Sequence, residues 1–282
     1  PKSRASRPRL PRSPGRLRWR RAGDGDLATP VEVDKAMCTL ILAHRFFPDA
    51  ALVVAANRDE LLARPASGPR LVEGPPRILM PRDEVAGGSW LGLNEHRLFV
   101  GITNRVGGPP DPSRRSRGQL VVESLQAPSA RSLHARLTRL EPALYNPFHL
   151  LYADGRDAFV TWADGQSLFQ YEINPGLHVI TERSLGGDDH GRAIRALAAF
   201  EERIDGRTPT LDELGALLAL HVEGDSVAGL CVHAEALGYG TRSSFVYVSG
   251  PQPLAGWREG AACRGQLENL SPPLTRLFAP PG

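Results

Sequence analysis

Cysteine is scarce in this chain of 282 residues, and its pattern excludes two common kinds of scaffold. Cys38, Cys231 and Cys263 are an odd number of cysteines and form no C-x-x-C pair. We therefore expect neither a disulfide framework nor a structural zinc site, and a reducing, cytoplasmic location fits this pattern. The eight histidines form no H-E-x-x-H or similar spacing, so we expect no metal and no cofactor. The triplet Cys231-Val232-His233 is the remaining candidate for a soft metal or haem iron.

Long hydrophobic runs are also lacking, although 41% of the residues are apolar. No run reaches the length that spans a membrane, so we expect a soluble chain with a sizeable core. The net charge of +3 comes from one end of the sequence. Residues 1–36 hold ten basic and four acidic residues, whereas the rest of the chain holds 24 basic and 27 acidic ones. The body therefore lacks a basic surface, and we expect no nucleic-acid partner.

Residues 1–36 have almost no apolar periodicity and contain several prolines, which predicts disorder. Three interpretations fit this basic segment: an organelle-targeting peptide, a nucleic-acid-binding arm, or an extension upstream of the true start. The prolines work against the amphipathic helix that a targeting peptide needs. We favour the extension, with Met37 as the initiator, because an ordered pattern begins abruptly there.

The first ordered stretch predicts a β-hairpin. Residues 39–46 and 51–55 are apolar, partly β-branched runs, and Pro48-Asp49 lies between them as a turn. With a two-residue loop, Cys38 pairs with the middle residue of Arg58-Asp59-Glu60, and a slip of one residue pairs it with either neighbour. The arginine would lower the pKa of the thiol, and the carboxylates would raise it. The alternative is a small core cysteine beside a solvated charge cluster.

Periodicity along the rest of the chain predicts antiparallel strands and two pairs of helices, an α+β arrangement. Asp-Gly and Asn-Pro-Gly turns separate the middle strands, which we interpret as one antiparallel meander. Thr210 and Glu213 predict a capping box for the last helix. We expect one domain at 37–265 and a Pro-rich tail at 266–282. The expected strands are 97–104, 148–153, 158–163, 168–173, 177–181, 245–249 and 254–259, and the expected helices are 118–126, 129–140, 189–204 (apolar face Ile194, Leu197, Phe200) and 211–221.

Two other segments each have two interpretations. Glycines around Trp90 indicate close backbone approach or a bend, and their spacing is not that of a dinucleotide-binding loop. Trp90 itself is a core residue or a ligand contact. The polar loop 109–117 contains Arg114, Arg115 and Arg117. We favour a solvated loop over an anion-binding patch.

If Met37 is removed, Cys38 becomes the amino-terminal residue. Its α-amino group, with a pKa of about 7.7–8.0, can then act as the base that activates the thiol. Five motifs follow one another along the chain: Met37-Cys38-Thr39-Leu40, Val54 to Glu60, Ala86 to Gly92, Thr103-Asn104 and Tyr239 to Ser244. Together, these motifs resemble the NRDE family, also called the Transport and Golgi organisation protein 2 family. The resemblance implies an N-terminal-nucleophile-hydrolase-like fold, a four-layer αββα sandwich of two antiparallel sheets between helix layers.

A more distant resemblance, to choloylglycine hydrolase and penicillin V acylase, implies roles for single residues. Cys38 would attack a carbonyl and Asn104 would donate to the oxyanion. Asp59 would orient the amine, while Arg58 and Arg242 would favour the thiolate. Where that group has a second Asn, this chain has Thr181-Glu182, and an ionised carboxylate cannot donate a hydrogen bond. The residues expected to contact substrate are Asn57, Glu60, Trp90 and Glu182.

Three functional hypotheses follow. The first is a cysteine amidohydrolase that acts on a linear amide. The second is a non-enzymatic binding or carrier protein for haem, acyl-CoA or another amphipathic small molecule, supported by Glu182 and by roles proposed for the family. The third, a nucleic-acid-associated protein that uses residues 1–36, ranks below both.

Overall fold

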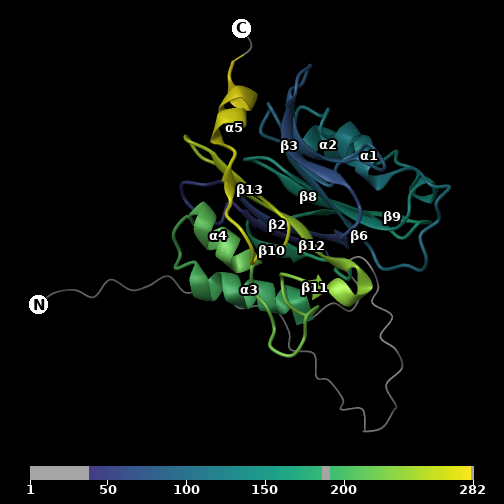
Figure 1. Ribbon diagram of the computed structural model, residues 1–282. Coiled ribbons are helices and arrows are strands. Elements are labelled where there is room, and N and C mark those ends of the chain that lie inside the picture. The colour runs from purple at the N-terminus through teal and green to yellow at the C-terminus, as the bar shows by residue number, and fades with distance from the viewer. Residues whose placement is uncertain (1–37, 186–190, 281–282) are drawn as a thin grey trace, which may run out of the picture. The chain divides into compact units, whose positions relative to one another are not determined.

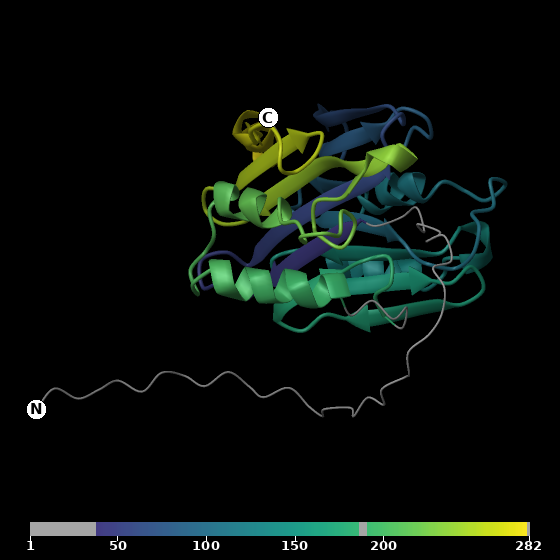
Figure 2. The same ribbon diagram turned by 60° about the horizontal axis from the view of Figure 1, so that its bottom comes forward.

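The computed structural model describes residues 38–185 and 191–280. The expectations for residues 1–36 and for Met37 therefore concern residues outside the described ones. The described chain forms two seven-stranded antiparallel sheets with helices on their outer faces (Figures 1 and 2). No helix among these residues is long and apolar enough to cross a membrane.

The first sheet is built around the predicted hairpin of β1 (Thr39–His44) and β2 (Leu52–Leu61). All of β1 and most of β2 are buried, because the sheet is covered on both faces. This explains their nearly continuous apolar sequences. The strand order is β10-β1-β2-β12-β13-β14, and β11 pairs with β12. The other strands are β10 (Gly176–Ile180), β11 (His233–Ala234), β12 (Tyr239–Val248), β13 (Leu254–Glu259) and β14 (Glu268–Asn269).

The observed register of the hairpin is shifted by one residue from the register that a two-residue loop would give. The Arg45 N–H donates to the Ala51 carbonyl at 2.7 Å, which leaves a loop of residues 46–50. Continuing this register by one step beyond β1 places Cys38 opposite Arg58. The predicted pairing of the thiol with the neighbouring aspartate is therefore wrong, and one of the two slipped pairings is correct.

The second sheet follows the chain in order from β3 to β9. Three of the four strands predicted as a meander belong to it, but β10 crosses to pair with β1 in the first sheet. The single meander is therefore wrong in its last strand. The first strand, β3, is not among the strands expected from the sequence. The strands are β3 (Ala66–Val72), β4 (Ile78–Asp83), β5 (Leu91–Asn94), β6 (Phe99–Asn104), β7 (Phe148–Ala153), β8 (Ala158–Ala163) and β9 (Leu168–Glu172).

Two helices cover the outer face of each sheet, which confirms the predicted αββα layers (Figure 2). The Thr210–Glu213 capping box is present. The predicted apolar face of α3 is partly wrong, because Ile194 is 59% exposed whereas Arg192 is buried. The helices are α1 (Arg117–Ser124) and α2 (Ala130–Leu137) on the second sheet, α3 (Gly191–Arg203) and α4 (Leu211–Leu218) on the first, and the short 3₁₀ turns Pro142–Leu144 and Glu235–Leu237.

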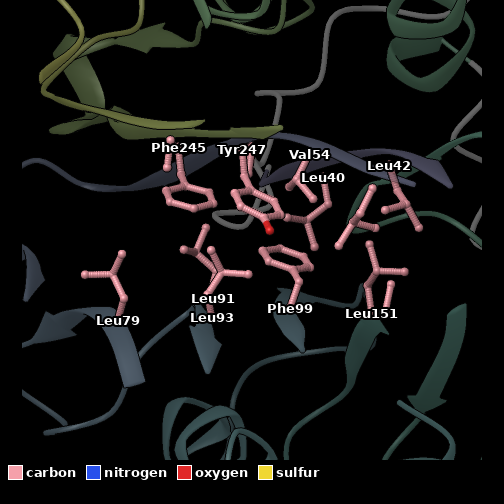
Figure 3. Close-up of a cluster of buried hydrophobic side chains, with 14 of the residues drawn as sticks. Leu40, Leu42, Val54, Leu79, Leu91, Leu93, Phe99, Leu151, Phe245 and Tyr247 are labelled. Atoms are coloured by element: carbon pink, nitrogen blue, oxygen red, sulfur yellow. The ribbon is translucent and has the colours of Figure 1, made fainter. Parts of the chain in front are cut away.

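Apolar side chains from both sheets form the central layer of the core (Figure 3). Phe99 and Phe245 stack across it with ring centroids 6.4 Å apart. Leu274 and Leu277 of α5 (Ser271–Phe278) are buried in the same cluster. The segment expected to be only a Pro-rich tail therefore contributes to the core.

Close backbone contact joins the β4–β5 connection to the start of α1. A Cβ atom on Gly88 would lie 2.3 Å from the carbonyl carbon of Gly118. The Ser89 N–H also donates to the Gly118 carbonyl at 3.1 Å. The glycine thus allows the start of α1 to pack directly on this connection, which is one of the two interpretations of the glycines around Trp90.

Gly88→Ala should destabilise the protein, because the added methyl group overlaps backbone atoms that cannot rotate away. Overpacking of this kind typically costs about 1–3 kcal/mol. Gly155→Ala is the matched control, since its Cβ would meet only Ala51 Cβ at 3.8 Å. Thermal unfolding of both variants measures the effect. Equal melting temperatures for the two would contradict the close contact.

Candidate functional site

A cavity of about 470 Å³ lies beside Cys38 and is lined by residues of both sheets and of the loop before α1. Six of the nine residues predicted for the site line this cavity. They are Cys38, Arg58, Asp59, Glu60, Trp90 and Asn104. Other charged residues of the lining are Arg64, Asp83, Asp111, Arg114, Arg115 and Arg117.

Cys38 lies directly before β1 and is partly buried. Its Sγ–H makes a long hydrogen bond of 3.7 Å to the Asp59 carbonyl. Burial and the negative charge of Asp59 raise the pKa of the Cys38 thiol to about 12, against the opposing charge of Arg58. With a peptide bond on its nitrogen, this thiol is therefore protonated at neutral pH and is a poor nucleophile.

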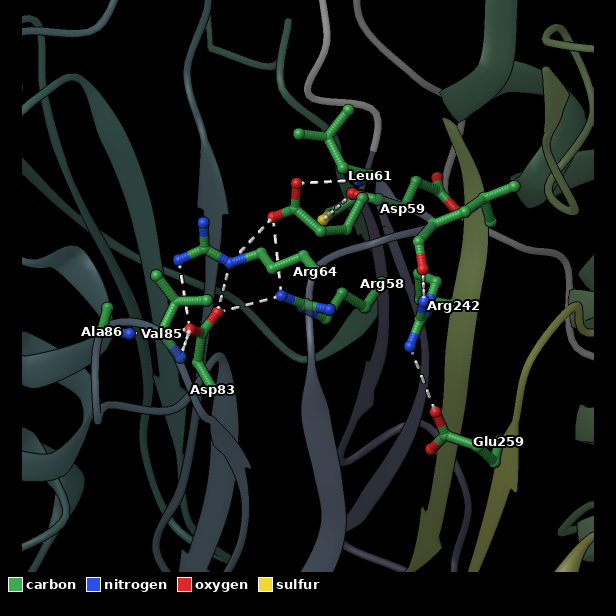
Figure 4. Close-up of polar contacts among 12 residues, drawn as sticks. Arg58, Asp59, Leu61, Arg64, Asp83, Val85, Ala86, Arg242 and Glu259 are labelled. Atoms are coloured by element: carbon green, nitrogen blue, oxygen red, sulfur yellow. Dashed lines mark hydrogen bonds and ion pairs between the residues drawn. The ribbon is translucent and has the colours of Figure 1, made fainter. Parts of the chain in front are cut away.

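Arg58 is held rigidly beside the thiol by an ion-pair network (Figure 4). It is 5% exposed, its Nη2 donates to Asp83 Oδ2 at 3.0 Å, and its guanidinium lies 4.3 Å from the centroid of the Trp90 ring. Arg64 binds the same carboxylate through Nε at 2.7 Å. Burial alone would raise the pKa of Asp83, but bonds from Arg64 and the Ala86 N–H lower it overall. A permanently charged, preorganised cation therefore faces the cavity.

Asp59 follows Arg58 and reaches the opposite face of the sheet, toward α3. The Thr241 hydroxyl donates to its Oδ1 at 2.5 Å, and Arg192 Nη1 lies 3.8 Å from Oδ2. Burial raises the pKa of Asp59 to about 7, although Arg192 and Thr241 oppose this. Glu182 Oε2 lies 3.9 Å from the same Arg192 nitrogen and does not line the cavity. The structure thus places Glu182 in a buried charge cluster outside the cavity wall.

Asn57 also lies outside the cavity. Its Nδ2 donates to the carbonyls of Leu218 and Leu230 at 2.9 and 2.7 Å, and its Oδ1 accepts from the Ser244 hydroxyl at 2.7 Å. These bonds join β2 to the chain around α4. The side chain therefore points toward the helix layer and away from the cavity in which we predicted a substrate contact.

Arg242 is the third predicted residue that the structure places elsewhere. The pairing of β12 with β2 shifts between Thr241 and Ser243, so Arg242 occupies a bulge. Its guanidinium donates to the Leu62 carbonyl and lies 3.8 Å from Glu259 (Figure 4). Arg242 is therefore not positioned to favour a thiolate at Cys38. Its neighbour Thr241 is the residue of β12 that bonds to Asp59.

Asn104 ends β6 and lines the cavity from the second sheet. Its side chain makes no hydrogen bond within residues 38–185 and 191–280, and its amide can therefore donate to a molecule in the cavity. The amide is the neutral donor that an oxyanion requires.

Arg114 and Arg115 of the loop before α1, and Arg117 at the first position of α1, are part of the lining. We had favoured a solvated loop for this segment. Arg114 and Arg115 have acidic partners at 3.6 and 2.7 Å. Arg117 donates to the Pro147 carbonyl at 2.9 Å and has no carboxylate partner in the described part of the chain. Burial lowers the pKa of Arg117. Three arginines within four residues were the sequence signal for this cationic part of the lining.

Two antiparallel sheets between helix layers, with a cysteine before a central strand, define an N-terminal-nucleophile-hydrolase-like fold. The chain is similar to the crystal structure of a variant of conjugated bile acid hydrolase from Clostridium perfringens, with a TM-score of 0.50. The match covers 82% of this chain and 96% of that chain at 10% identity, so it concerns the fold alone.

The chain belongs to the Transport and Golgi organisation 2 family, whose model matches residues 37–250. It is 32% identical over 106 residues to the Transport and Golgi organization 2 homolog of Mus musculus and to that of Homo sapiens. These matches cover 36% of this chain and 38% of the length of each relative. The family and the fold class predicted from the motifs are confirmed.

Asp59→Asn should change how stability depends on pH. The folded-state pKa of about 7 exceeds the ordinary value of 3.8, so the folded protein keeps a proton that the unfolded chain releases. The stability of wild type relative to Asp59→Asn should be highest below about pH 4. It should then fall by about 1.4 kcal/mol per pH unit until about pH 7. Denaturant unfolding across this range measures the difference.

Asp83→Asn is the control for this experiment. Because the pKa of Asp83 is lowered in the fold, its contribution to stability changes only below the window used for Asp59. A difference between wild type and Asp59→Asn that stays constant from about pH 4 to about pH 7 would contradict the raised pKa.

Proposed function

We propose that the protein is a cysteine amidohydrolase that cleaves linear amide bonds, with Cys38 as its nucleophile and mature amino terminus. The observation that carries this proposal is the joint lining of one cavity by Cys38, Arg58 and Asn104. A thiol, a fixed cation and a neutral amide donor are the groups that acyl transfer through a thioester requires. The fold and the family are consistent with this chemistry.

The free amino group of Cys38 would supply the missing base. The thiol has a pKa of about 12 when a peptide precedes it, whereas an α-amino group titrates at about 7.7–8.0. In the proposed reaction the amine accepts the thiol proton while Sγ bonds to the amide carbon. Asn104 donates to the oxyanion, and the amine returns the proton to the leaving nitrogen as the C–N bond breaks. Water then hydrolyses the thioester and restores the thiol.

The other residues of the site position these groups. Arg58, fixed by Asp83 and Trp90, would favour the thiolate by its charge. Asp59 would orient the Cys38 amine, because its backbone carbonyl already contacts the thiol. We propose no catalytic role for Arg242, since its guanidinium is bonded outside the cavity.

The charges of the cavity favour a substrate with an anionic group. Arg117 reaches the cavity without a carboxylate partner among the described residues, and an anion there would complete its hydrogen bonds. The same arginine would also suit the alternative carrier function, since haem and acyl-CoA are anionic as well. Trp90 and Ile102 are the larger apolar side chains of this lining, which suits a compact polar amide better than a long apolar ligand. A cytoplasmic location stays a prediction from the cysteine pattern.

The mature amino terminus and Cys38 test the proposed reaction. A chain expressed from Met37 should have the intact mass of a protein whose first residue is Cys38. This protein should hydrolyse N-acyl amino acids and release the free amine. Cys38→Ala should abolish release, and Asn104→Ala should lower kcat by about 10²–10³. A retained Met37, or turnover unchanged in Cys38→Ala, would reject the proposal.

Arg117→Gln tests the preference for an anionic substrate. The variant should lose about tenfold to a hundredfold in kcat/KM on N-acyl amino acids, the value of one charge-assisted hydrogen bond. Activity on the corresponding neutral amides should change little. Arg115→Gln is the matched control, because this arginine is paired with Glu123. Haem that binds saturably, by absorbance, to a protein without amidase activity would favour the carrier function instead.

A further inference from the structure

Four side chains that can bind a metal meet at a second place, apart from the lining of the Cys38 cavity. His221 follows α4, Cys231 precedes β11, His233 belongs to β11 and Cys263 lies in the turn after β13. Their ligand atoms all lie within 4.8 Å of one another. Segments far apart in the sequence therefore bring two thiols and two imidazoles together.

The distances within this cluster fit one tetrahedral ion. Nε2 of His233 lies 3.4 Å from Sγ of Cys231 and 3.2 Å from Sγ of Cys263. Zinc bound to sulfur at about 2.3 Å and to nitrogen at about 2.0–2.1 Å requires a sulfur–nitrogen separation of about 3.5 Å. These two sulfur–nitrogen distances would need to change by only a few tenths of an ångström to coordinate it.

A carboxylate outside the cluster orients His233. Oε1 of Glu235 lies 2.9 Å from Nδ1 of His233, so the Nδ1–H donates to it. The lone pair of Nε2 then points toward the two sulfur atoms. Zinc-binding histidines characteristically donate their other ring nitrogen to a carboxylate in this way.

The backbone around the cluster is held by hydrogen bonds that do not involve the four side chains. The N–H groups of Leu230 and Cys231 both donate to the Leu220 carbonyl, at 2.9 and 3.0 Å, which brings His221 beside them. The His233 N–H donates to the Ser226 carbonyl at 2.8 Å. The ligands are therefore preorganised, and a cavity of about 650 Å³ lined by three of the four gives access to them.

We propose that His221, Cys231, His233 and Cys263 bind one zinc ion as a structural site. Thiolate and imidazole ligands prefer zinc to the hard cations magnesium and calcium. Four protein ligands fill a tetrahedral shell and leave no position for a reacting water, so the ion is structural. It would join the loop after α4, the edge strand β11 and the turn after β13.

The site would also stabilise a residue of the Cys38 region. Val232, between two of the ligands, donates its N–H to the Thr241 hydroxyl at 2.8 Å and accepts from the Thr241 N–H at 2.9 Å. The same hydroxyl donates to Asp59. The ion would thus fix the backbone that holds Thr241 in place. This inference does not depend on the proposed amidase activity.

Metal binding to the reduced full chain tests the site. After dialysis against Zn²⁺ the wild type should retain one zinc per chain by elemental analysis. With Co²⁺ it should show thiolate-to-cobalt charge transfer and the intense visible bands of tetrahedral cobalt. Cys263→Ser and His221→Ala, which change exposed ligands, should lose both signals while keeping the circular dichroism of the fold. Glu235→Gln should weaken zinc affinity by about 10–100-fold.

Cys38→Ser and His178→Ala are the matched controls, because they remove a thiol and an imidazole outside the cluster. Both should keep one zinc per chain. The proposal is overturned if the reduced wild type takes up no stoichiometric zinc, or if its cobalt spectrum is octahedral. It is also overturned if Cys263→Ser binds the metal as well as Cys38→Ser does.

Discussion

Burial of the β1–β2 hairpin on both faces is the constraint on which the site depends. Successive residues of a strand point to opposite faces, so the end of β2 sends Arg58 toward the cavity and Asp59 toward α3. Both side chains are almost fully buried, and each charge therefore needs a partner of opposite sign. Two ion clusters form back to back: Arg58 and Arg64 both pair with Asp83 on one face, and Arg192 pairs with Asp59 on the other.

These two clusters differ in what they do to the thiol. In the cluster at Asp83, several donors hold the carboxylate ionised, so Arg58 and Arg64 keep a constant partner. The cluster at Asp59 has a carboxyl whose burial outweighs its partners, so its charge changes near neutral pH. Cys38 lies between a constant cation and a titrating acid. Such a pair of opposed environments is common where proton transfer is needed, and rare in a merely packed core.

Features set by local sequence could be predicted, and those set by packing between distant segments could not. The hairpin, the strands from β6 to β10, helices α1 to α4, the capping box and six cavity residues follow from periodicity, turns and motifs, whereas β3 to β5 and α5 were not predicted. The hairpin register was missed because the chain closes the turn with five residues instead of two. Arg242 was misplaced because a bulge gives no sequence signal. Arg192 was not among the predicted site residues, since its buried acidic partners lie on other elements. Cys231 and His233 were recognised as a candidate metal-binding triplet, but His221 and Cys263 were missed because distant segments of the chain supply them.

The loop of residues 46–50 has a consequence for which changes of length the chain tolerates. It lies outside the ladder that the Arg45–Ala51 hydrogen bond closes, so extra residues there leave every strand pair unchanged. A deletion of one residue within β2 would have the opposite effect. It would exchange the faces of Arg58 and Asp59, and each charge would meet the partners of the other. The exposed tip at Pro48-Asp49 is therefore a better point for inserted residues than any position in β2, whereas Phe47 and Ala50 of the same loop are buried in the core.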